Sequence, residues 1–193
     1  MLLRPLNAAL VALALILPAQ GALANQGHTG ATEQAMKPGQ KRALRKAAAE
    51  LELARAELKQ AVAVAEANTK PSKGRIWCVP FARAVTGVEI KGNAVTWWKQ
   101  AAARYERGSD PKIGAVMNFR GTKKMPMGHV AVVSNIIDSR RIQIDHANWV
   151  RNRITKDQLV IDVSAANDWS EVRVVNADGS MGRVNPIFGF IYN

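Results

Sequence analysis

The chain has 193 residues, a formal net charge of +12 and a single cysteine, Cys78. Once an export signal and a polar helical stretch are set aside, about 115 to 120 residues remain for a packed core, which excludes a second catalytic domain. A lone cysteine excludes an internal disulfide bond. The positive charge favours anionic partners, such as wall polymers or phospholipid headgroups.

The first residues have the arrangement of a secretory signal peptide. Arg4 precedes an apolar run over residues 6–17, and small residues follow at Ala22 and Ala24. We therefore predict a signal peptide over residues 1–24, cleaved after Ala24; a signal anchor is the alternative. The run is too short to span a bilayer, and no later segment approaches about 18 consecutive apolar residues. We expect an exported mature protein, periplasmic or secreted, without a transmembrane segment.

Composition divides the next part of the chain into segments. Residues 25–39 are small and polar with scattered Gly and Pro, which predicts a disordered leader. A second stretch of this kind, at residues 70–76, predicts a linker. We therefore expect the catalytic domain to occupy residues 77–193.

Residues 40–69 lie between the leader and the linker and predict one helix with a weak apolar stripe. Ala, Leu, Glu, Lys and Arg dominate, and Leu44, Leu51, Leu58 and Ala65 recur every seven residues. We interpret this helix as a spacer or as a helix that lies on the next domain, where it could gate the site. Self-association as a coiled coil is the alternative, and we expect a monomer.

Short helices precede a series of strands in the predicted domain. The pattern predicts helices over residues 78–85 and 94–105. Later segments alternate or run apolar as strands do, at residues 113–119, 129–136, 141–146, 159–163, 171–175 and 188–192. This order predicts the α+β class, with short N-terminal helices packed on an antiparallel sheet.

Cys78 stands where a helix is expected to begin. Pro80 falls in the first turn, where a missing N–H is tolerated. Free N–H groups and the positive end of the helix dipole lower the pKa of a thiol at such a position, which favours a nucleophile. The backbone N–H of Cys78 would also suit an oxyanion donor. The alternative is an inert cysteine buried as a small hydrophobic residue.

Two histidines, His129 and His146, are available as bases in this domain. His129 opens an apolar run of the central-strand type, and the preceding Gly128 permits close approach of another backbone or a substrate. In the next strand, alternation places His146 inward and Asp145 toward solvent. Asn148 keeps the inward parity if the strand continues, so either His146 or Asn148 orients the ring of His129.

The same cysteine and two histidines could instead hold a catalytic zinc ion. Their spacings, from 78 to 129 and from 129 to 146, match no compact zinc pattern. We therefore expect no metal and no cofactor.

Five segments of the domain follow one another in an order that is specific as a set. They are CVPFAR at 78–83, GNAVTWW at 92–98, IGAVMNF at 113–119, GHVAVV at 128–133 and HANW at 146–149. The set resembles the CHAP family of cysteine, histidine-dependent amidohydrolases and peptidases, which are papain-like enzymes. The resemblance covers about Trp77 to Tyr192.

The resemblance implies that Cys78 is the nucleophile and His129 the general base. The third polar position, often Glu in the family, falls on His146, and Asn148 matches an Asn two residues later. Ala115 stands where many relatives carry Asp, a difference that we interpret as structural. The implied reaction is acyl transfer, in which the thiolate attacks an amide carbon and water hydrolyses the acyl-enzyme.

Four tryptophans flank the proposed site: Trp77, Trp97, Trp98 and Trp149. Flat apolar rings suit the walls of a groove for sugar or peptide. Our candidate substrate-binding residues are Trp77, Trp98 and Trp149, and Trp77 and Trp149 are favoured because each stands beside a catalytic element. At least two of the four are expected to pack in the core.

The sequence thus predicts an exported cysteine hydrolase that cleaves amide bonds in peptidoglycan, as an N-acetylmuramoyl-L-alanine amidase or a cross-bridge endopeptidase. The alternative is a non-enzymatic basic adaptor that binds wall or membrane through a decayed site. The expected partners are peptidoglycan or its peptide stems, together with anionic envelope surfaces. Nucleic acid is not expected as a partner of an exported protein.

Overall fold

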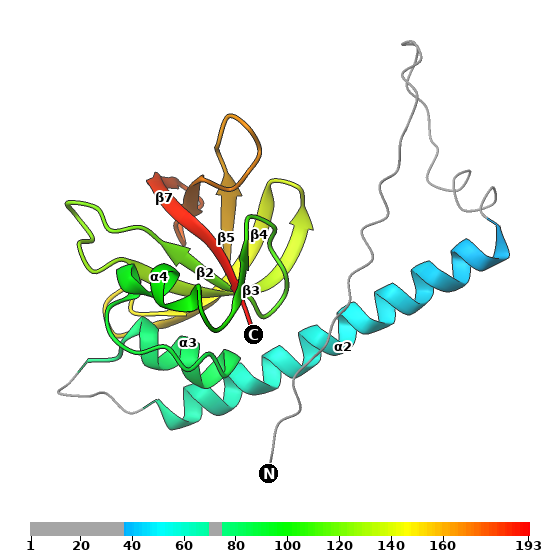
Figure 1. Cartoon of the computed structure of the whole chain (residues 1–193), viewed down its shortest axis with the longest axis horizontal. Coiled ribbons are helices and arrows are strands. Elements are labelled where there is room, and N and C mark those ends of the chain that lie inside the picture. Colours follow the sequence, from blue (N-terminus) through cyan, green and yellow to red (C-terminus); the bar gives the residue numbers. More distant parts are fainter. Residues whose placement is uncertain (1–36, 70–74) are drawn as a thin grey trace. The chain divides into compact units, whose positions relative to one another are not determined.

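A computed structural model describes residues 37–69 and 75–193 (Figure 1). The predicted signal peptide and most of the predicted leader lie outside these residues. The elements, in chain order, are α2 (Pro38–Asn68), α3 (Cys78–Thr86), η1 (Ala94–Thr96), α4 (Trp97–Ala101), β1 (Glu106–Gly108), β2 (Val116–Phe119), β3 (His129–Asp138), β4 (Arg141–Ala147), β5 (Ile154–Asp162), β6 (Glu171–Val175) and β7 (Met181–Tyr192). No helix among the described residues has the length and apolar character needed to cross a membrane.

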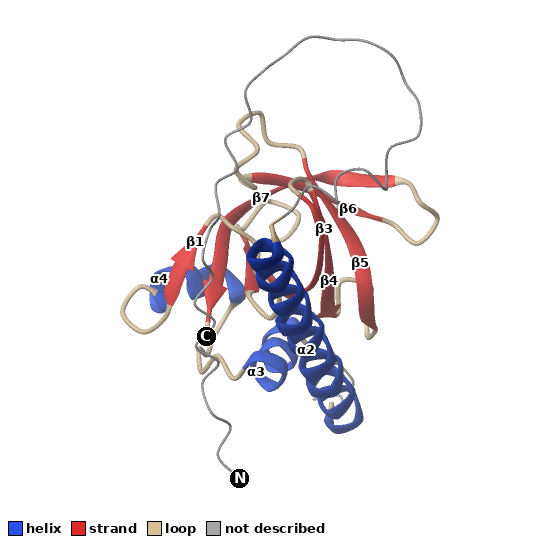
Figure 2. Cartoon of the chain, turned by 90° about the vertical axis from the view of Figure 1, so that its right-hand side faces the viewer, coloured by secondary structure: helices blue, strands red, loops and turns tan. Residues whose placement is uncertain are grey.

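Seven antiparallel strands form one sheet that closes on itself. The strand order is β1-β7-β2-β3-β4-β5-β6, and β6 also pairs with β7. Closure is possible because β7 is long: its first part pairs with β6 and its second part with β2. Figure 2 shows the strands as one strongly curved layer, with α3 and α4 outside it. Short helices followed by an antiparallel sheet agree with the predicted α+β class.

Alternate side chains of the sheet enter two different cores. On β3, Val130 and Val132 pack in the core that includes α3, whereas Ala131 and Val133 pack in the core on the other face. A sheet covered on both faces buries both parities of its strands. This explains the continuous apolar run after His129.

The C-terminal part of α2 belongs to the same compact unit as the sheet, which extends from Leu51 to Asn193. Leu58, Val62 and Ala65 are buried in the core that includes α3. Leu44 is 52 % exposed. The compact unit therefore reaches back into the long helix, whereas the sequence placed the domain boundary at the linker that follows it.

Polar contacts also join this part of α2 to the sheet. Lys156 on β5 forms an ion pair of 2.9 Å with Glu66. The guanidinium of Arg55 donates a hydrogen bond to Asn135 on β3. The last four turns of α2 are thus bonded to the sheet by both apolar and polar contacts.

Several elements differ in extent from their predictions. The helix predicted over residues 94–105 ends at Ala101, and β1 was not predicted. Strand β5 begins at Ile154 and β7 at Met181, several residues before the predicted starts. The early part of β7 carries turn-forming residues, including Pro186, and pairs with β6 where the sheet closes. The early part of β5 carries the polar run from Thr155 to Gln158 and pairs with β4.

Asp145 was expected to face solvent, but only 4 % of it is exposed. Asp145 lies beside Val132 on the face of the sheet that the helices cover. The face of β4 opposite to His146 is therefore buried as well. The backbone N–H of Asp157 donates a 2.7 Å hydrogen bond to its carboxylate. Burial raises the pKa of Asp145 to about 6.

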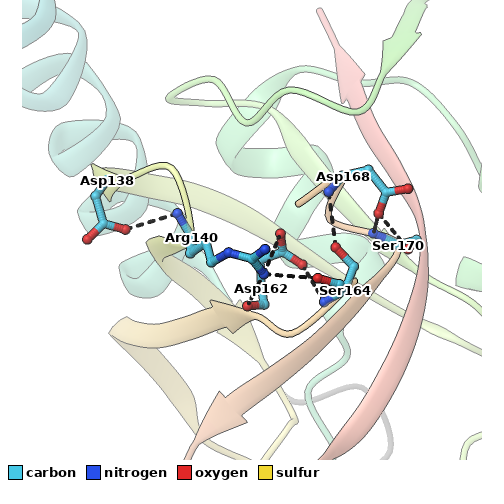
Figure 3. A network of polar contacts seen from close by, with 6 residues as sticks. All are labelled: Asp138, Arg140, Asp162, Ser164, Asp168 and Ser170. Carbon is cyan, nitrogen blue, oxygen red and sulfur yellow. Dashed lines mark hydrogen bonds and ion pairs between the residues drawn. The ribbon is translucent and has the colours of Figure 1, made fainter. Parts of the chain in front are cut away.

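A polar network at the far end of β3 ties two loops together (Figure 3). The backbone N–H of Arg140 donates to Asp138, and its guanidinium donates to the carbonyl of Ser164 at 2.9 Å. The same guanidinium lies 3.7 Å from the buried carboxylate of Asp162. The Ser164 hydroxyl in turn accepts the N–H of Asp168. These bonds join the β3–β4 turn to the loop after β5.

Candidate active site

The predicted catalytic residues come from three elements. Cys78 is the first residue of α3, His129 the first of β3, and His146 lies next to the last residue of β4. The strands β2, β3 and β4 are antiparallel neighbours, so the end of β2, the start of β3 and the end of β4 meet at one edge of the sheet.

Gly128 allows a second backbone to approach directly before His129. The N–H of Val95 donates to the carbonyl of Met127 at 2.8 Å, and a Cβ atom on Gly128 would lie 2.8 Å from that nitrogen. Gly128 also has a φ of 67°, in the left-handed region. Of the two roles considered for this glycine, the structure shows close approach of another backbone.

The thiol of Cys78 is free and partly exposed. Burial raises the pKa of Cys78, while the backbone N–H groups of Val130, Val79 and Cys78 itself act in the opposite direction. The pKa is therefore raised overall, although the helix position predicted a lowered one. Val130 directly follows His129, so its N–H places the sulfur beside the start of β3.

His129 and His146 are buried and hydrogen bonded to each other. The Nε2 atom of His129 lies 3.0 Å from the Nδ1 atom of His146. Burial, and secondarily His146, holds the pKa of His129 well below its ordinary value. Burial lowers the pKa of His146 to about 4, which a hydrogen bond to Gln158 partly opposes. Both imidazoles are therefore neutral at pH 7.

Aromatic rings surround this pair. The ring of Trp149 lies 5.0 Å from that of His129 and 5.5 Å from that of His146. Phe119, at the end of β2, lies 5.6 Å from His129 in an edge-on contact. These rings limit water access and fix the orientation of both imidazoles.

Asn148 does not continue β4, because the strand ends at Ala147 and Asn148 has a φ of 63°. Its Oδ1 atom accepts the backbone N–H of Asn152 at 2.9 Å and its own N–H donates to the carbonyl of Arg153. The expectation that Asn148 points inward like His146 required the strand to continue, and the strand does not do so. Of the two predicted orienting residues, His146 makes the hydrogen bond to His129.

The remaining tryptophans have different surroundings. Trp97 is fully buried. Trp98 stacks on Phe188 with ring centroids 5.9 Å apart, and Arg107 lies 4.7 Å from its ring. Trp77 is 37 % exposed and lines a pocket of about 190 Å³ that also includes Pro80. Trp77 and Trp149 thus lie beside the catalytic elements, while Trp97 and Trp98 pack within the fold.

Gln158 on β5 is a site residue that the sequence did not reveal. Its Oε1 atom lies 2.6 Å from Nε2 of His146, and its Nε2 atom donates to the carbonyl of Val175 at 2.9 Å. In the sequence it stands in the polar run KDQ, which carries no strand alternation. Its pairing partner across the β4–β5 ladder, Ile144, could have been inferred only with the register known.

Cationic side chains occupy the loops at this edge. The segments 75–77, 120–128 and 148–153 contain six Lys or Arg residues and no Asp or Glu: Arg75, Arg120, Lys123, Lys124, Arg151 and Arg153. In residues 37–69 and 75–193, no three His, Cys, Asp or Glu side chains are grouped as metal ligands. The reactive groups gathered here are a thiol and two imidazoles, and the neighbouring loops are positively charged.

A comparison with protein families gives one match, and it covers the segment that contains these residues. Residues 69–148 match the family model of the CHAP domain, a segment that includes Cys78, His129, His146 and Asn148. The match confirms the resemblance over these residues; it does not extend to Tyr192. No curated protein matches the chain. Residues 69–148 of this chain are thus similar to the CHAP domain, and a CHAP domain indicates a hydrolase of the peptidoglycan amidase or peptidase type.

Proposed function

We propose that this protein is an exported cysteine hydrolase that cleaves amide bonds of peptidoglycan through an acyl-enzyme on Cys78. The hydrogen bond between His129 and His146, 3.0 Å long, carries this proposal. It fixes a neutral imidazole at the start of β3, where the N–H of Val130 meets the thiol. A nucleophile, a base and a group that orients the base are the parts that acyl transfer requires.

The pKa directions define the resting state of the pair. Burial favours the neutral thiol of Cys78 and the neutral imidazole of His129. The proton therefore rests on sulfur and moves to His129 as the sulfur attacks. This is general-base catalysis from a neutral pair, without a thiolate formed in advance.

The proposed cycle has two stages. In the first, the Cys78 sulfur bonds to the amide carbon, its proton passes to His129, and the carbonyl oxygen gains negative charge opposite the N–H of Cys78. Collapse breaks the C–N bond, and the amine leaves with the proton from His129. In the second stage, His129 takes a proton from water, which attacks the thioester and releases a carboxylic acid and the free thiol.

The surroundings of the pair suit an anionic peptide or glycopeptide. Trp77 and Trp149 offer partly exposed rings beside the nucleophile and the base, and we propose both as walls of the substrate groove. The cationic loops complement the carboxylates of wall peptides. Asn148 belongs to the turn that presents Trp149, whereas Trp98 stacks on Phe188 and carries Arg107 over its ring, so the proposed groove is formed without it.

Export is proposed from the sequence of residues 1–24. A basic residue, a short apolar run and small residues in that order are typical of a cleaved signal. A wall hydrolase must cross the membrane to meet its substrate. The proposed location is therefore the periplasm or the medium.

Purified wall sacculi test the reaction. Wild-type protein is expected to lower their turbidity and to release fragments whose masses identify the broken amide bond. Cys78→Ala and His129→Ala are expected to lose this activity, whereas His28→Ala, a histidine change in the predicted leader, should keep it. Equal clearing by Cys78→Ala and wild type would refute the proposal. Salt-sensitive binding of all variants, with no release by any, would favour the adaptor alternative.

A further inference from the structure

We infer that Gln158 is a positioning residue that sets which nitrogen of His129 is the catalytic base. This inference rests on the proposed function, because it concerns the same base. It follows from a chain of hydrogen bonds that crosses four neighbouring strands, from Val175 on β6 through Gln158 on β5 and His146 on β4 to His129 on β3.

The chain of bonds has one possible direction. The carbonyl oxygen of Val175 can only accept, so the side-chain atom of Gln158 that faces it, at 2.9 Å, is the amide nitrogen. The amide oxygen of Gln158 therefore faces His146, 2.6 Å from its Nε2 atom. An amide oxygen can only accept as well. Nε2 of His146 must carry the hydrogen.

The same logic continues to the next ring. A neutral imidazole that carries its hydrogen on Nε2 has its lone pair on Nδ1. Nδ1 of His146 therefore accepts the bond of 3.0 Å, and Nε2 of His129 donates it. The lone pair of His129 then lies on Nδ1. The atom that takes the thiol proton is Nδ1 of His129, and a backbone carbonyl three strands away determines this.

Loss of the amide would remove the constraint. Without an acceptor at Nε2, His146 can place its hydrogen on Nδ1 and donate to His129. His129 must then accept this bond through Nε2 and carry its own hydrogen on Nδ1. A protonated Nδ1 has no free lone pair, so it cannot take the thiol proton. A carboxylate at position 158 acts differently, because an adjacent negative charge favours the protonated ring and raises the pKa of His146.

Histidine NMR tests this inference without turnover. The chain contains three histidines, so the ring nitrogens of full-length protein labelled with ¹⁵N-histidine can be assigned with His28→Ala, His129→Ala and His146→Ala. At pH 7 we expect Nε2–H tautomers for both His129 and His146. A Nδ1–H tautomer of either residue in the wild type would overturn the inference.

Variants at position 158 give a second test. In Gln158→Met we expect a shift of His146 toward the Nδ1–H tautomer and a fall in kcat of about 100-fold with little change in KM, within the range that general-base catalysis supplies. In Gln158→Glu we expect the pKa of His146 to rise by about two pH units and the acidic limb of kcat to move upward with it. Unchanged tautomers in the first variant, or an unmoved pKa in the second, would overturn the inference.

Gln143→Met is the matched control. Gln143 lies on the neighbouring strand β4 and also bridges two partners, the side chain of Asn135 and the carbonyl of Asp157, but it is outside the chain of bonds. In this variant, the tautomers of His129 and His146 and the value of kcat should match those of wild type. If the tautomers are as assigned but wild type releases no wall fragments, the proposed function fails, and only the assignment of the hydrogens to the two rings holds. If wild type cleaves the wall but His129 and His146 carry the opposite tautomers, the proposed function holds and the inference is overturned.

Discussion

Replacement of Asp145 by Asn is expected to stabilise the protein at neutral pH. Burial raises the pKa of Asp145 to about 6, roughly two pH units above an ordinary aspartate near 3.9. Each unit corresponds to about 1.4 kcal/mol, so the ionised carboxylate costs the folded state at most about 3 kcal/mol. Relaxation around the charge reduces this, and we expect a gain of about 1 to 2 kcal/mol.

The pH dependence has a defined sign. The folded-state pKa lies above the unfolded one, so the folded state binds more protons between about pH 4 and pH 6. The free energy of unfolding therefore falls as the pH rises through this window and is level above it. The advantage of Asp145→Asn should be absent at pH 4, grow to about pH 6 and then stay constant. The amide oxygen can still accept the N–H of Asp157.

Urea unfolding followed by tryptophan fluorescence at pH 4, 6 and 7.5 measures the difference. The control is Asp162→Asn, a buried carboxylate that has a cationic partner in Arg140 and that accepts the backbone N–H of Ser164. Loss of the paired charge should lower stability at pH 7.5. If Asp145→Asn destabilised the protein at pH 7.5 as Asp162→Asn is expected to do, the claim that the buried charge of Asp145 lowers the stability of the folded protein would be refuted.

Three further predictions concern the thiol, the cationic loops and the long helix. Because burial raises the pKa of Cys78, its alkylation by iodoacetamide, measured by mass, should still accelerate above about pH 8.5; a plateau near pH 6 would contradict the neutral pair. Changing Lys123 and Lys124 together to Glu should lower kcat/KM on sacculi about tenfold at low salt, and the loss should vanish in 0.5 M NaCl, where charges are screened beyond about 4 Å. A loss independent of salt would argue against charge complementarity. Leu58→Ala should lower the free energy of unfolding by about 2 to 3 kcal/mol, because Leu58 is in the core, whereas exposed Leu44→Ala should change it by less than about 0.5. Equal effects would show that the helix is a loose spacer.

Cys78 and His129 could be singled out from the sequence as candidate nucleophile and base because each carries a local signal. Cys78 precedes a proline at a helix start, and His129 follows a glycine and opens a run apolar on both faces. These signals depend on a few neighbouring residues. The family match over residues 69–148 includes both positions.

The errors concern residues whose surroundings come from distant parts of the chain. Asp145 alternates as a solvent-facing residue should, but the helices cover that face of the sheet. Asn148 shares the parity of His146, but a left-handed turn ends the strand before it. Gln158 was missed because its partners belong to β4 and β6, and only the register of the closed barrel brings them to it.

The hydrogen bonds across β6, β5, β4 and β3 also connect catalysis to the order in which the chain is made. Cys78, His129 and His146 all leave the ribosome before Val175, whose carbonyl fixes the amide of Gln158. Strand β6 is held in turn by β7, which follows it in the chain. A nascent or truncated chain can therefore hold all three candidate catalytic side chains and still lack the bonds that set the tautomer of His129. Under the proposed function, pairing of β6 with β7 would then be required before His129 can act as the base.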